Sequence, residues 1–545
     1  MDFSIFDKQG HITLMSSFLP SECLEKIFSY LIEYPSSDVN TNLYIKDLYS
    51  CTLVSRHWCR ISSPLLYVYP FHHFRENSPQ IQPYYKLIRT LLSCIPQSEM
   101  KHIKEKLNIK PNSHTISPTF NYVSFIRGII FHRMMFKSRM ICNNKEIWLN
   151  EHNPKMISEE STIIIMKYLI KFIYKNCNNL TTLEFPFILK NENYYLIELL
   201  SFKRKSKLSN LKELYYSFQI DLFSQNANNT RINFCLSNNV CNLNLLYVNI
   251  NGINDINQLC RFISSQKKLQ HFVYSGKEIL YENQYTMSMR NRKDFITEID
   301  NYNAVINSLA SQSESLKILE FRDLDLIISI INEEVKKSLS LLKNIKELKL
   351  YKCENIEGLH SWVKELKKLE VFEITLHYRR IYHLIYSIES FSSNLTKLII
   401  SCNDKTDIDE YYNSLYRQIS IYLVSLTHLE LPRILPFELI PIFKSCTKLV
   451  YLSVILFNVQ LMKENLKNLG KHVPKTLKRI QFKESNPDLT ISSKLLRFFL
   501  EGYANNSGAL KYLEIHEVFG DRIYVSELFG VQIIIKSKNS LYIFS

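Results

Sequence analysis

Glycine is scarce in this chain: only 10 of the 545 residues are glycine. No Gly-rich phosphate loop and no dinucleotide-binding fingerprint occurs, and both motifs need closely spaced glycines that bring the backbone near a phosphate. A nucleotide site of the common kinds is therefore not expected, and we predict no cofactor.

Paired cysteines are also missing, although the chain has 12 cysteines. No Cys-x-x-Cys motif occurs, and pairs such as Cys51 with Cys59 or Cys235 with Cys241 lack the spacing of zinc ligands. Cys51, His57 and Cys59 are the one conceivable ligand set, but their apolar setting favours a structural role on a helix. Unpaired cysteines are typical of a reducing compartment, so we expect a cytoplasmic or nuclear location, or both.

Long apolar runs and catalytic motifs are absent as well. No stretch reaches the length of a membrane span, and the N-terminus carries no signal-peptide pattern, so no membrane association is predicted. Neither a Gly-x-Ser-x-Gly elbow nor a His-Glu-x-x-His pair occurs. A hydrolase hidden in the chain is the remaining catalytic alternative, but we expect the chain to catalyse no reaction itself.

What the chain does have begins with two short apolar stretches near the N-terminus, LPSECLEKIFSYL and LYSCTLVSRHWCRISSPLLY. Pro20 suits the start of a helix, and Leu24, Ile27, Phe28 and Leu31 then fall on one helical face. A second helical stripe comprises Leu48, Cys51, Leu53 and Val54, after which Ser55 caps a turn, Trp58 adds bulk and Pro64 ends the segment. Because stretches this short cannot bury their own apolar surface, they predict a docking partner.

The residue types and order in these stretches resemble an F-box: a Leu-Pro start, an apolar helix and a Leu-Val-Ser-x-x-Trp segment. The connection over residues 32–46 is longer than usual in that family. The resemblance implies a three-helix F-box over residues 15–70 that binds a Skp-family adaptor and, through it, a cullin scaffold with its RING protein. The alternative is a three-helix cap on a larger core. The residues expected at the adaptor interface are Leu19, Pro20, Leu24, Ile27, Phe28, Leu31, Leu53, Val54, Ser55 and Trp58.

From residue 179 to residue 545 a short pattern repeats. Twelve segments, from NLTTLEF to ALKYLEI, read as variants of Leu-x-x-Leu-x-Leu, and helical patterns such as SKLLRFFLEGY lie between them. This region resembles cysteine-containing leucine-rich repeats, which implies an α/β solenoid, a horseshoe of alternating short parallel strands and helices. Cys353 and Asn251 follow predicted strands and Cys177 and Cys446 precede them, where buried polar side chains can satisfy backbone groups.

Both ends of the predicted solenoid need a cap, because a repeat array exposes an apolar cross-section at each end. We predict that residues 71–178 form a helical linker and N-terminal cap, with FIRGIIF as an irregular first repeat. The segment GVQIIIKSKNSLYIF is the candidate for the C-terminal cap.

The outward positions of the predicted strands line a concave face that we expect to hold a target protein. Acids and bases are mixed there. Reversing Glu320, Glu347, Glu373 and Glu430 to Lys is expected to leave the fold intact, because the change does not touch the buried leucines that support the strands. Tyrosines suit protein interfaces because they combine a large stiff ring with a polar tip. The expected target-facing residues are Glu184, Glu213, Tyr215, Tyr247, His271, Glu320, Arg322, Glu347, Lys349, Tyr351, Glu373, Lys397, His428, Glu430, Tyr451, Arg479, Lys483, Tyr512 and Glu514.

The formal net charge of +15 first suggests an anionic partner such as nucleic acid. The excess bases, however, fall on predicted loops and helices, in runs such as FKRKSK, and such runs are usually solvated surface. We therefore predict no specific nucleic-acid partner. The expected function is that of a substrate receptor in an SCF-type ubiquitin ligase, and the alternative is a leucine-rich-repeat interaction scaffold outside any ligase.

Overall fold

The structure is a computed structural model, and contacts within the chain divide it into two compact units, residues 1–243 and residues 244–545. Each unit is described by itself. The residues that the structure describes are 19–31, 42–71, 81–106, 118–130, 159–177, 179–185, 207–219, 240–251, 256–276, 302–324, 326, 333–354, 356–376, 381–391, 393–402, 410–456, 463–483, 493–504, 506, 508, 510–516, 531–536 and 541–544.

The first unit begins with three helices, α1 (Ser21–Ser29), α2 (Asn42–Val54) and α3 (Arg56–Leu66), as the sequence predicts for its N-terminal region. Helix α3 starts as expected from the Ser55 cap, whose hydroxyl accepts a hydrogen bond from the Trp58 backbone N–H at 3.1 Å. The expectation that Pro64 ends this segment is wrong. Pro64 lies inside α3, where it removes one backbone donor only two residues before the helix ends.

These three helices, residues 19–31 and 42–71, form a small core of their own, and we call them the three-helix module. Leu24, Phe28 and Leu48 are buried at its centre, and the Phe28 ring meets the Trp58 ring edge-on with centroids 5.0 Å apart. The side chains packed around that centre are Leu31, Cys51, Trp58, Ile61, Leu65 and Leu66.

The rest of the first unit combines helices with three strands. Its helices are α4 (Ile81–Ser93), α5 (Gln97–Lys106), α6 (Tyr122–Phe125), α10 (Glu159–Asn176) and the 3₁₀ turn η4 (Lys207–Asn210). Its strands are β1 (Gly128–Ile130), β2 (Thr182–Phe185) and β3 (Glu213–Gln219), with β2 pairing in parallel with both neighbours. Strand β1 comes from the FIRGIIF segment, and β2 and β3 come from the first two Leu-x-x-Leu-x-Leu segments.

The second unit is a sheet in which each strand pairs with the next along the chain. The strands are β4 (Leu245–Asn251), β5 (His271–Ser275), β6 (Ile318–Arg322), β7 (Glu347–Tyr351), β8 (Val371–Leu376), β9 (Lys397–Cys402), β10 (His428–Ile434), β11 (Tyr451–Leu456), β12 (Arg479–Phe482), β13 (Tyr512–His516), β14 (Gln532–Lys536) and β15 (Leu541–Phe544). All described pairs in this unit are parallel except the last, in which β15 runs antiparallel to β14.

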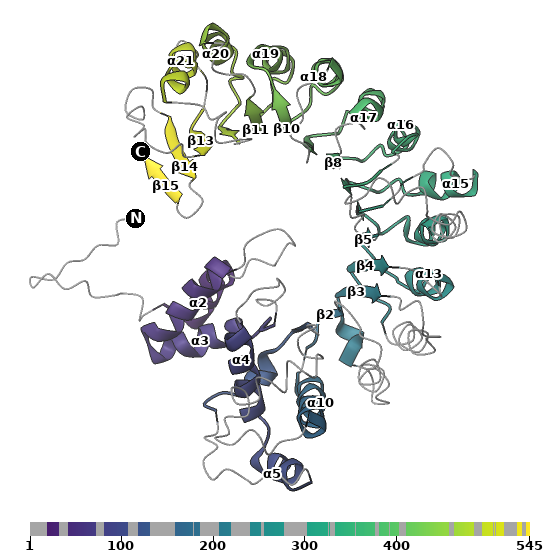
Figure 1. The fold of residues 1–545 in the computed structure, drawn as a ribbon, viewed down its shortest axis with the longest axis vertical. Coiled ribbons are helices and arrows are strands. Elements are labelled where there is room, and N and C mark those ends of the chain that lie inside the picture. Colours follow the sequence, from purple (N-terminus) through teal and green to yellow (C-terminus); the bar gives the residue numbers. More distant parts are fainter. Residues whose placement is uncertain are drawn as a thin grey trace, which may run out of the picture. The chain divides into compact units, whose positions relative to one another are not determined.

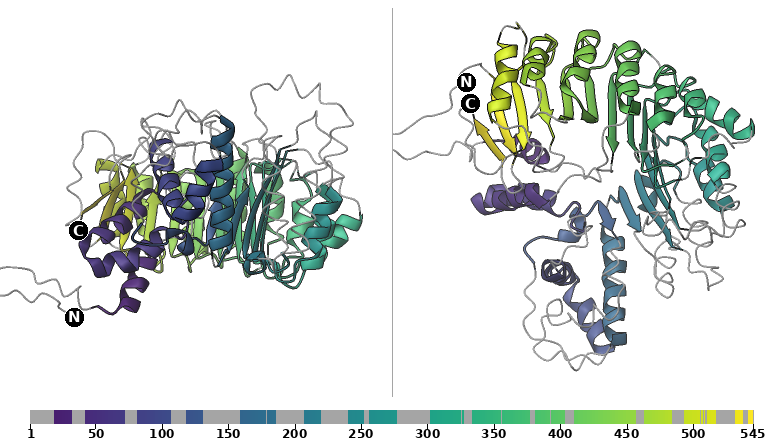
Figure 2. Two further views of the ribbon diagram at one scale, coloured as in Figure 1. Left: turned by 90° about the horizontal axis from the view of Figure 1, so that it is seen from below. Right: turned by 45° about the horizontal axis from the view of Figure 1, so that its top comes forward.

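The helices of the second unit lie on one side of this sheet, on the outside of its curve, and leave the other side of the strands facing inward (Figures 1 and 2). They are α13 (Ile256–Ser264), the 3₁₀ turn η6 (Ala310–Gln312), α15 (Glu333–Leu341), α16 (Leu359–Val363), α17 (Ile381–Ile388), α18 (Glu410–Tyr422), α19 (Pro436–Ser445), α20 (Lys463–Lys471) and α21 (Ser493–Tyr503). Strands that alternate with helices give the α/β sheet that the sequence predicts.

The core of the second unit contains a row of apolar side chains, one from each turn that enters strands β5 to β12. Each is at most 1% exposed, and burying a side chain of this size contributes about 1.5–3 kcal/mol. The row comprises Leu269, Leu316, Ile345, Leu369, Leu395, Leu426, Leu449 and Leu477. Each of these residues is the first apolar residue of its Leu-x-x-Leu-x-Leu segment. The sequence repeat therefore reflects a position that is buried in one repeat after another.

Buried cysteines have the structural role that the sequence predicts. The Cys353 thiol lies 3.4 Å from the carbonyl oxygen of Phe321, the Cys446 thiol 3.4 Å from that of Leu423, and the Cys177 thiol 3.6 Å from that of Tyr174. Burial raises the pKa of Cys353 to about 12, which keeps that thiol protonated as a donor. The side chain of Asn251 lies outside the described residues.

Within the described ranges, no helix is long and apolar enough to cross a membrane, and no three or more His, Cys, Asp or Glu side chains are grouped in a way that would hold a metal ion.

Two glycines allow α20 and α21 to approach closely, and replacing them is expected to destabilise the fold. A Cβ atom on Gly470 would overlap the backbone oxygen of Phe499, and one on Gly502 would overlap the backbone oxygen of Lys467. Alanine is favoured over glycine in a helix by about 1 kcal/mol, but the overlap with rigid backbone outweighs that gain. We expect Gly470→Ala and Gly502→Ala each to lower the free energy of unfolding by about 1–3 kcal/mol in a urea titration.

The matched control is Asn468→Ala, because Asn468 lies exposed on the same helix α20. It should leave the free energy of unfolding unchanged or slightly higher. Equal stability of all three variants would contradict close packing of these helices.

Candidate functional site

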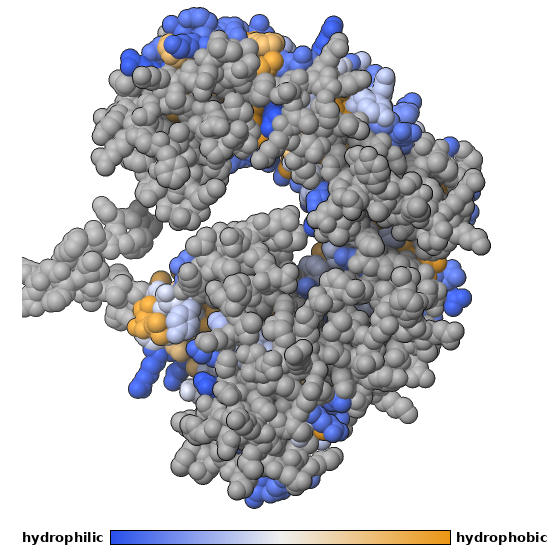
Figure 3. Space-filling view, in the orientation of Figure 1, coloured by the Kyte–Doolittle hydropathy of each residue, from blue (hydrophilic) through white to orange (hydrophobic). Residues whose placement is uncertain are grey.

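The three-helix module leaves large apolar side chains in solvent. Leu19 is 38% exposed, Ile27 49%, Leu53 70% and Val54 51%. Figure 3 shows hydrophobic residues gathered at the left side of this module, among more polar neighbours. We call Leu19, Ile27, Leu53 and Val54 the exposed apolar surface. Such a surface on a small helical module is typical of a protein-binding site.

The other residues expected at the adaptor interface have different positions. Leu24 and Phe28 are 1% exposed, so the expectation that they contact a partner directly is wrong: they form the module's own core. A module this small needs the apolar face of its helices to form its own core. Only apolar side chains beside that face remain available to a partner.

Four further residues expected at the adaptor interface are not part of the exposed apolar surface but stabilise the helices that carry it. Leu31 and Trp58 are partly buried against the module's core. Ser55 is the helix cap, and Pro20 lies exposed where α1 begins, its carbonyl accepting hydrogen bonds from the N–H groups of Cys23 and Leu24.

Two exposed tyrosines of the module were missed by sequence reasoning. Tyr30 is 69% exposed and Tyr49 54% exposed, and the Lys26 ammonium lies 5.2 Å from the Tyr30 ring centroid. Both lie off the apolar stripe, and the only signal in the sequence is that Tyr30 follows Ile27 at helical spacing.

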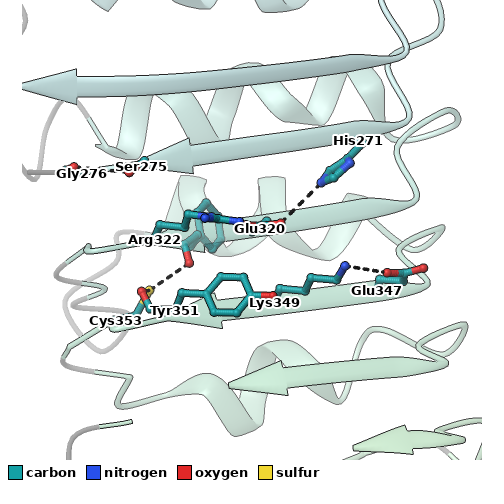
Figure 4. A network of polar contacts seen from close by, with 10 residues as sticks. His271, Ser275, Gly276, Glu320, Arg322, Glu347, Lys349, Tyr351 and Cys353 are labelled. Atoms are coloured by element: carbon teal, nitrogen blue, oxygen red, sulfur yellow. Dashed lines mark hydrogen bonds and ion pairs between the residues drawn. The ribbon is translucent and has the colours of Figure 1, made fainter. Parts of the chain in front are cut away.

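A second candidate site is the inward side of the strands in the second unit. The register places Val273, Glu320, Lys349 and Glu373 side by side on β5 to β8. Figure 4 shows His271, Arg322, Glu347, Lys349 and Tyr351 on the same strands. We call this side of the sheet the strand face. It is a connected polar network rather than a set of separate side chains.

Glu320 is the most buried charge in this network, with only 4% of its surface exposed. The Arg322 guanidinium contacts one carboxylate oxygen, and the His271 Nε2 atom lies 3.6 Å from the other. Burial raises the pKa of Glu320, but the neighbouring His271 and Arg322 outweigh burial and hold this pKa below its usual range. Glu320 is therefore an ionised, internally neutralised carboxylate.

The neighbouring side chains continue the network. The Lys349 ammonium lies 3.1 Å from a Glu347 carboxylate oxygen, and the Arg322 guanidinium carbon lies 4.9 Å from the Tyr351 ring centroid. Burial raises the pKa of Glu373 above its usual value, although Tyr351 and Lys349 act in the opposite direction. Glu320, Arg322, Glu347 and Lys349 therefore each have a partner of opposite sign beside them.

The same rule holds further along the strand face. The Lys483 ammonium lies 2.6 Å from a Glu430 oxygen, and the Arg479 guanidinium contacts Glu514, which is 1% exposed. Gln481, which sequence reasoning missed, accepts hydrogen bonds from the Tyr451 hydroxyl at 2.9 Å and the Ser453 hydroxyl at 3.0 Å. Its only signal in the sequence is its place in the strand register.

These contacts correct one expectation about the strand face. Glu320 and Glu514 point inward from the sheet as predicted, but they are not exposed acids, because adjacent bases cover and neutralise them. Reversing Glu320 to Lys would therefore place two cations together in a buried site, so from the structure we expect this change to destabilise the fold.

The remaining expected residues extend over more strands. In the first unit, Glu213 accepts a hydrogen bond from the Thr182 hydroxyl at 3.1 Å, and Glu184 pairs in register with Tyr215. In the second unit, Tyr247 stands beside Val273. Lys397, His428 and Tyr512 are the first residues of β9, β10 and β13.

Comparison with known proteins bears on the N-terminal region. A family model described as F-box-like matches residues 16–73. The chain therefore has an F-box-like domain, which contains the three-helix module, followed by an α/β region of parallel strands and helices. No curated protein matches the chain significantly.

Among solved structures, the crystal structure of the Rad7 and Elc1 complex in yeast matches with 13% identity and a TM-score of 0.33, covering 65% of this chain and 72% of that chain. A TM-score this low does not establish a common fold.

The Glu320–Arg322 pair allows a direct test of the strand face. Because removing one partner of a buried ion pair leaves the other charge uncompensated, we expect Arg322→Gln to lower the free energy of unfolding by about 3 kcal/mol at neutral pH. The double variant Glu320→Gln with Arg322→Gln removes both charges and should recover much of that loss.

The control for this cycle is Lys349→Gln, whose partner Glu347 is more exposed, so its cost should be at most about 1 kcal/mol. The pKa of Glu320 is depressed in the fold, so the stabilisation is present at neutral pH and is lost as acid protonates Glu320. An Arg322→Gln penalty that is unchanged by Glu320→Gln would contradict the pairing.

Proposed function

We propose that this protein is the substrate-recognition subunit of an SCF-type ubiquitin ligase. The F-box-like domain would dock on a Skp-family adaptor and, through it, on a cullin scaffold and its RING protein. The observation that carries the proposal is the exposed apolar surface on a domain that matches the F-box-like family. A module that buries Leu24 and Phe28 but leaves Leu53 in water has the form of one half of an interface.

We interpret the region from residue 179 onward as a leucine-rich-repeat solenoid that holds the target protein on its strand face. The supporting observations are the strand found in each of the twelve Leu-x-x-Leu-x-Leu segments and the row of buried apolar side chains that precede β5 to β12. Parallel strands stacked in sequence order present a long surface on which many shallow contacts can add together.

The mechanism we propose is proximity rather than catalysis by this chain. A receptor that binds a target at one site and the ligase at another converts ubiquitin transfer into a reaction within one complex. The effective concentration of target lysines near the charged conjugating enzyme then rises without any catalytic group on the receptor. We propose no cofactor, and a cytoplasmic or nuclear location, or both, for this activity.

The second candidate function is a repeat scaffold that binds partners outside any ligase, with the three-helix module acting as a cap. The exposed Leu53 and Val54 favour the ligase, because a cap would gain nothing from large apolar side chains in solvent. Adaptor binding distinguishes the two functions.

Replacing the exposed apolar surface should abolish adaptor binding without unfolding the chain. We expect the variant Leu19→Ala, Ile27→Ala, Leu53→Ala and Val54→Ala to lose at least about 2 kcal/mol of binding free energy when titrated with a purified Skp-family adaptor. Its thermal unfolding midpoint should fall only modestly, since each of the four side chains is already more than one-third exposed in the fold.

Two further variants show whether the effect is local. Tyr386→Ala removes another large side chain, 67% exposed on α17, and should bind the adaptor normally. Phe28→Ala opens the module's core and should cost about 3–5 kcal/mol of its stability. Normal adaptor binding by the fourfold variant would refute the proposed function.

The fourfold variant should also trap targets without modifying them. In cells with the proteasome blocked, proteins captured by the wild-type chain should carry ubiquitin, whereas the same proteins captured by the variant should not, because the receptor no longer reaches the ligase. The measurement is quantitative mass spectrometry of captured proteins and their ubiquitin remnants. Equal modification in both captures would support the scaffold instead.

A further inference from the structure

The proposed function places a target on the strand face without saying which chemistry the target presents, and the edge of the sheet at which β9 to β13 begin bears on that question. The first residues of these five strands stand side by side in register, and they are Lys397, His428, Tyr451, Arg479 and Tyr512. We call this row the edge ladder. Neighbouring strands lie about 4.8 Å apart, so the ladder is about 19 Å long.

The middle of the edge ladder is held in place by contacts among its own members. The His428 and Tyr451 ring centroids are 5.9 Å apart, and the Arg479 guanidinium carbon lies 5.8 Å from the Tyr451 centroid. Yet Tyr512 is 39% exposed and the Arg479 side chain 46% exposed, so the ladder also faces solvent. It is a preorganised surface, which lowers the entropic cost of binding.

Lysines gather in the turns that lead into the ladder. Lys478 and Lys511 immediately precede β12 and β13, and Lys448 and Lys475 lie a few residues before β11 and β12. All four are exposed, and none of them forms an ion pair with a described residue. The Lys511 backbone N–H donates to the Lys478 carbonyl at 2.9 Å, which fixes these two lysines on adjacent repeats.

Acids do not cancel this positive charge. The turn sequences over residues 423–427, 446–450, 471–478 and 504–511 contain no Asp or Glu. On the strand face beside them, Glu430 is neutralised by Lys483 and Glu514 by Arg479. The turn before β9 does carry one acid, Glu389, but from β10 to β13 the edge presents a field of one sign, which attracts and orients an anionic partner.

We propose that the edge ladder and its flanking lysines dock an acidic, extended segment of the target protein. The proposal rests on the proposed function only in identifying the partner as a target. Carboxylates along an extended chain would pair with Lys448, Lys478 and Lys511, and the exposed Tyr512 ring would supply apolar contact between them.

The geometry favours a peptide over a nucleic-acid strand. Proteins that bind single strands without sequence preference offer successive aromatic rings on which bases stack. Here Tyr451 already has His428 and Arg479 against it, and its hydroxyl donates to Gln481 at 2.9 Å, so only Tyr512 is free to stack. One ring does not make a stacking platform, whereas fixed cations and a single aromatic anchor suit a short acidic peptide.

The test is fluorescence anisotropy of the full chain with a labelled dodecapeptide of alternating Glu and Ser, at low salt. The variant Lys448→Glu, Lys478→Glu and Lys511→Glu should bind this peptide at least about tenfold more weakly than the wild type. The control Arg261→Glu, Lys337→Glu and Arg417→Glu makes the same charge change at exposed helix positions and should stay within about twofold of the wild type. If the first variant unfolds, the corresponding Gln variant replaces it.

Three outcomes would overturn the proposal: equal binding by the wild type and the Lys→Glu variant, an equal loss in the helix control, or tighter binding of an oligothymidine of the same net charge. The last would assign the edge to nucleic acid. As a second readout, burial and Lys397 hold the pKa of His428 below its usual range, and bound carboxylates should raise it in an NMR titration.

Adaptor binding, measured on the same proteins, separates this proposal from the proposed function. If the wild type binds the adaptor but not the acidic peptide, the docking edge is refuted and the ligase role stands. If it binds the peptide but not the adaptor, the ligase role is refuted and the acidic docking edge stands.

Discussion

The in-register pairing of parallel strands is the constraint on which the second unit depends. Strands β5 to β12 each bury the same apolar position, so the positions that follow it are fixed as inward or outward, with one register shift between Leu431 and Arg433 in β10. A slip of one residue would exchange the two sides of a strand and place Glu320 in the apolar core. Rows of side chains such as Val273, Glu320, Lys349 and Glu373 follow from this register and not from any local motif.

The same register explains why the strand face is polar yet nearly self-neutralised. Side chains about 4.8 Å apart on neighbouring strands meet directly, so an acid in one repeat finds a base in the same strand or in a nearby strand. Glu514 with Arg479 and Glu430 with Lys483 are formed this way. Unbalanced charge is left where strands begin, in turns outside the paired rows, and there the lysines are exposed.

Sequence reasoning worked where a residue's surroundings lie within its own repeat. The Leu-x-x-Leu-x-Leu pattern located twelve strands, and Ser55 was recognised as a cap, because these roles depend on near neighbours. Sequence reasoning failed where residues far away in the sequence determine whether a side chain is buried or exposed. An apolar helical stripe does not say whether Phe28 faces its own core or a partner, and the burial of Glu320 depends on His271, which is far away in the sequence. The edge lysines belong to no charge run in the sequence, and only the stacking of the repeats places them together.

The central claim is that the F-box-like domain binds a Skp-family adaptor through the exposed flanks of its helices. Hydrogen–deuterium exchange of the full chain with and without the adaptor tests this claim most directly, because it reports every amide at once. We predict slower exchange in α1 and around Leu53 and Val54, and unchanged exchange in strands β5 to β13. Protection confined to the strands, with none in residues 19–66, would contradict the account.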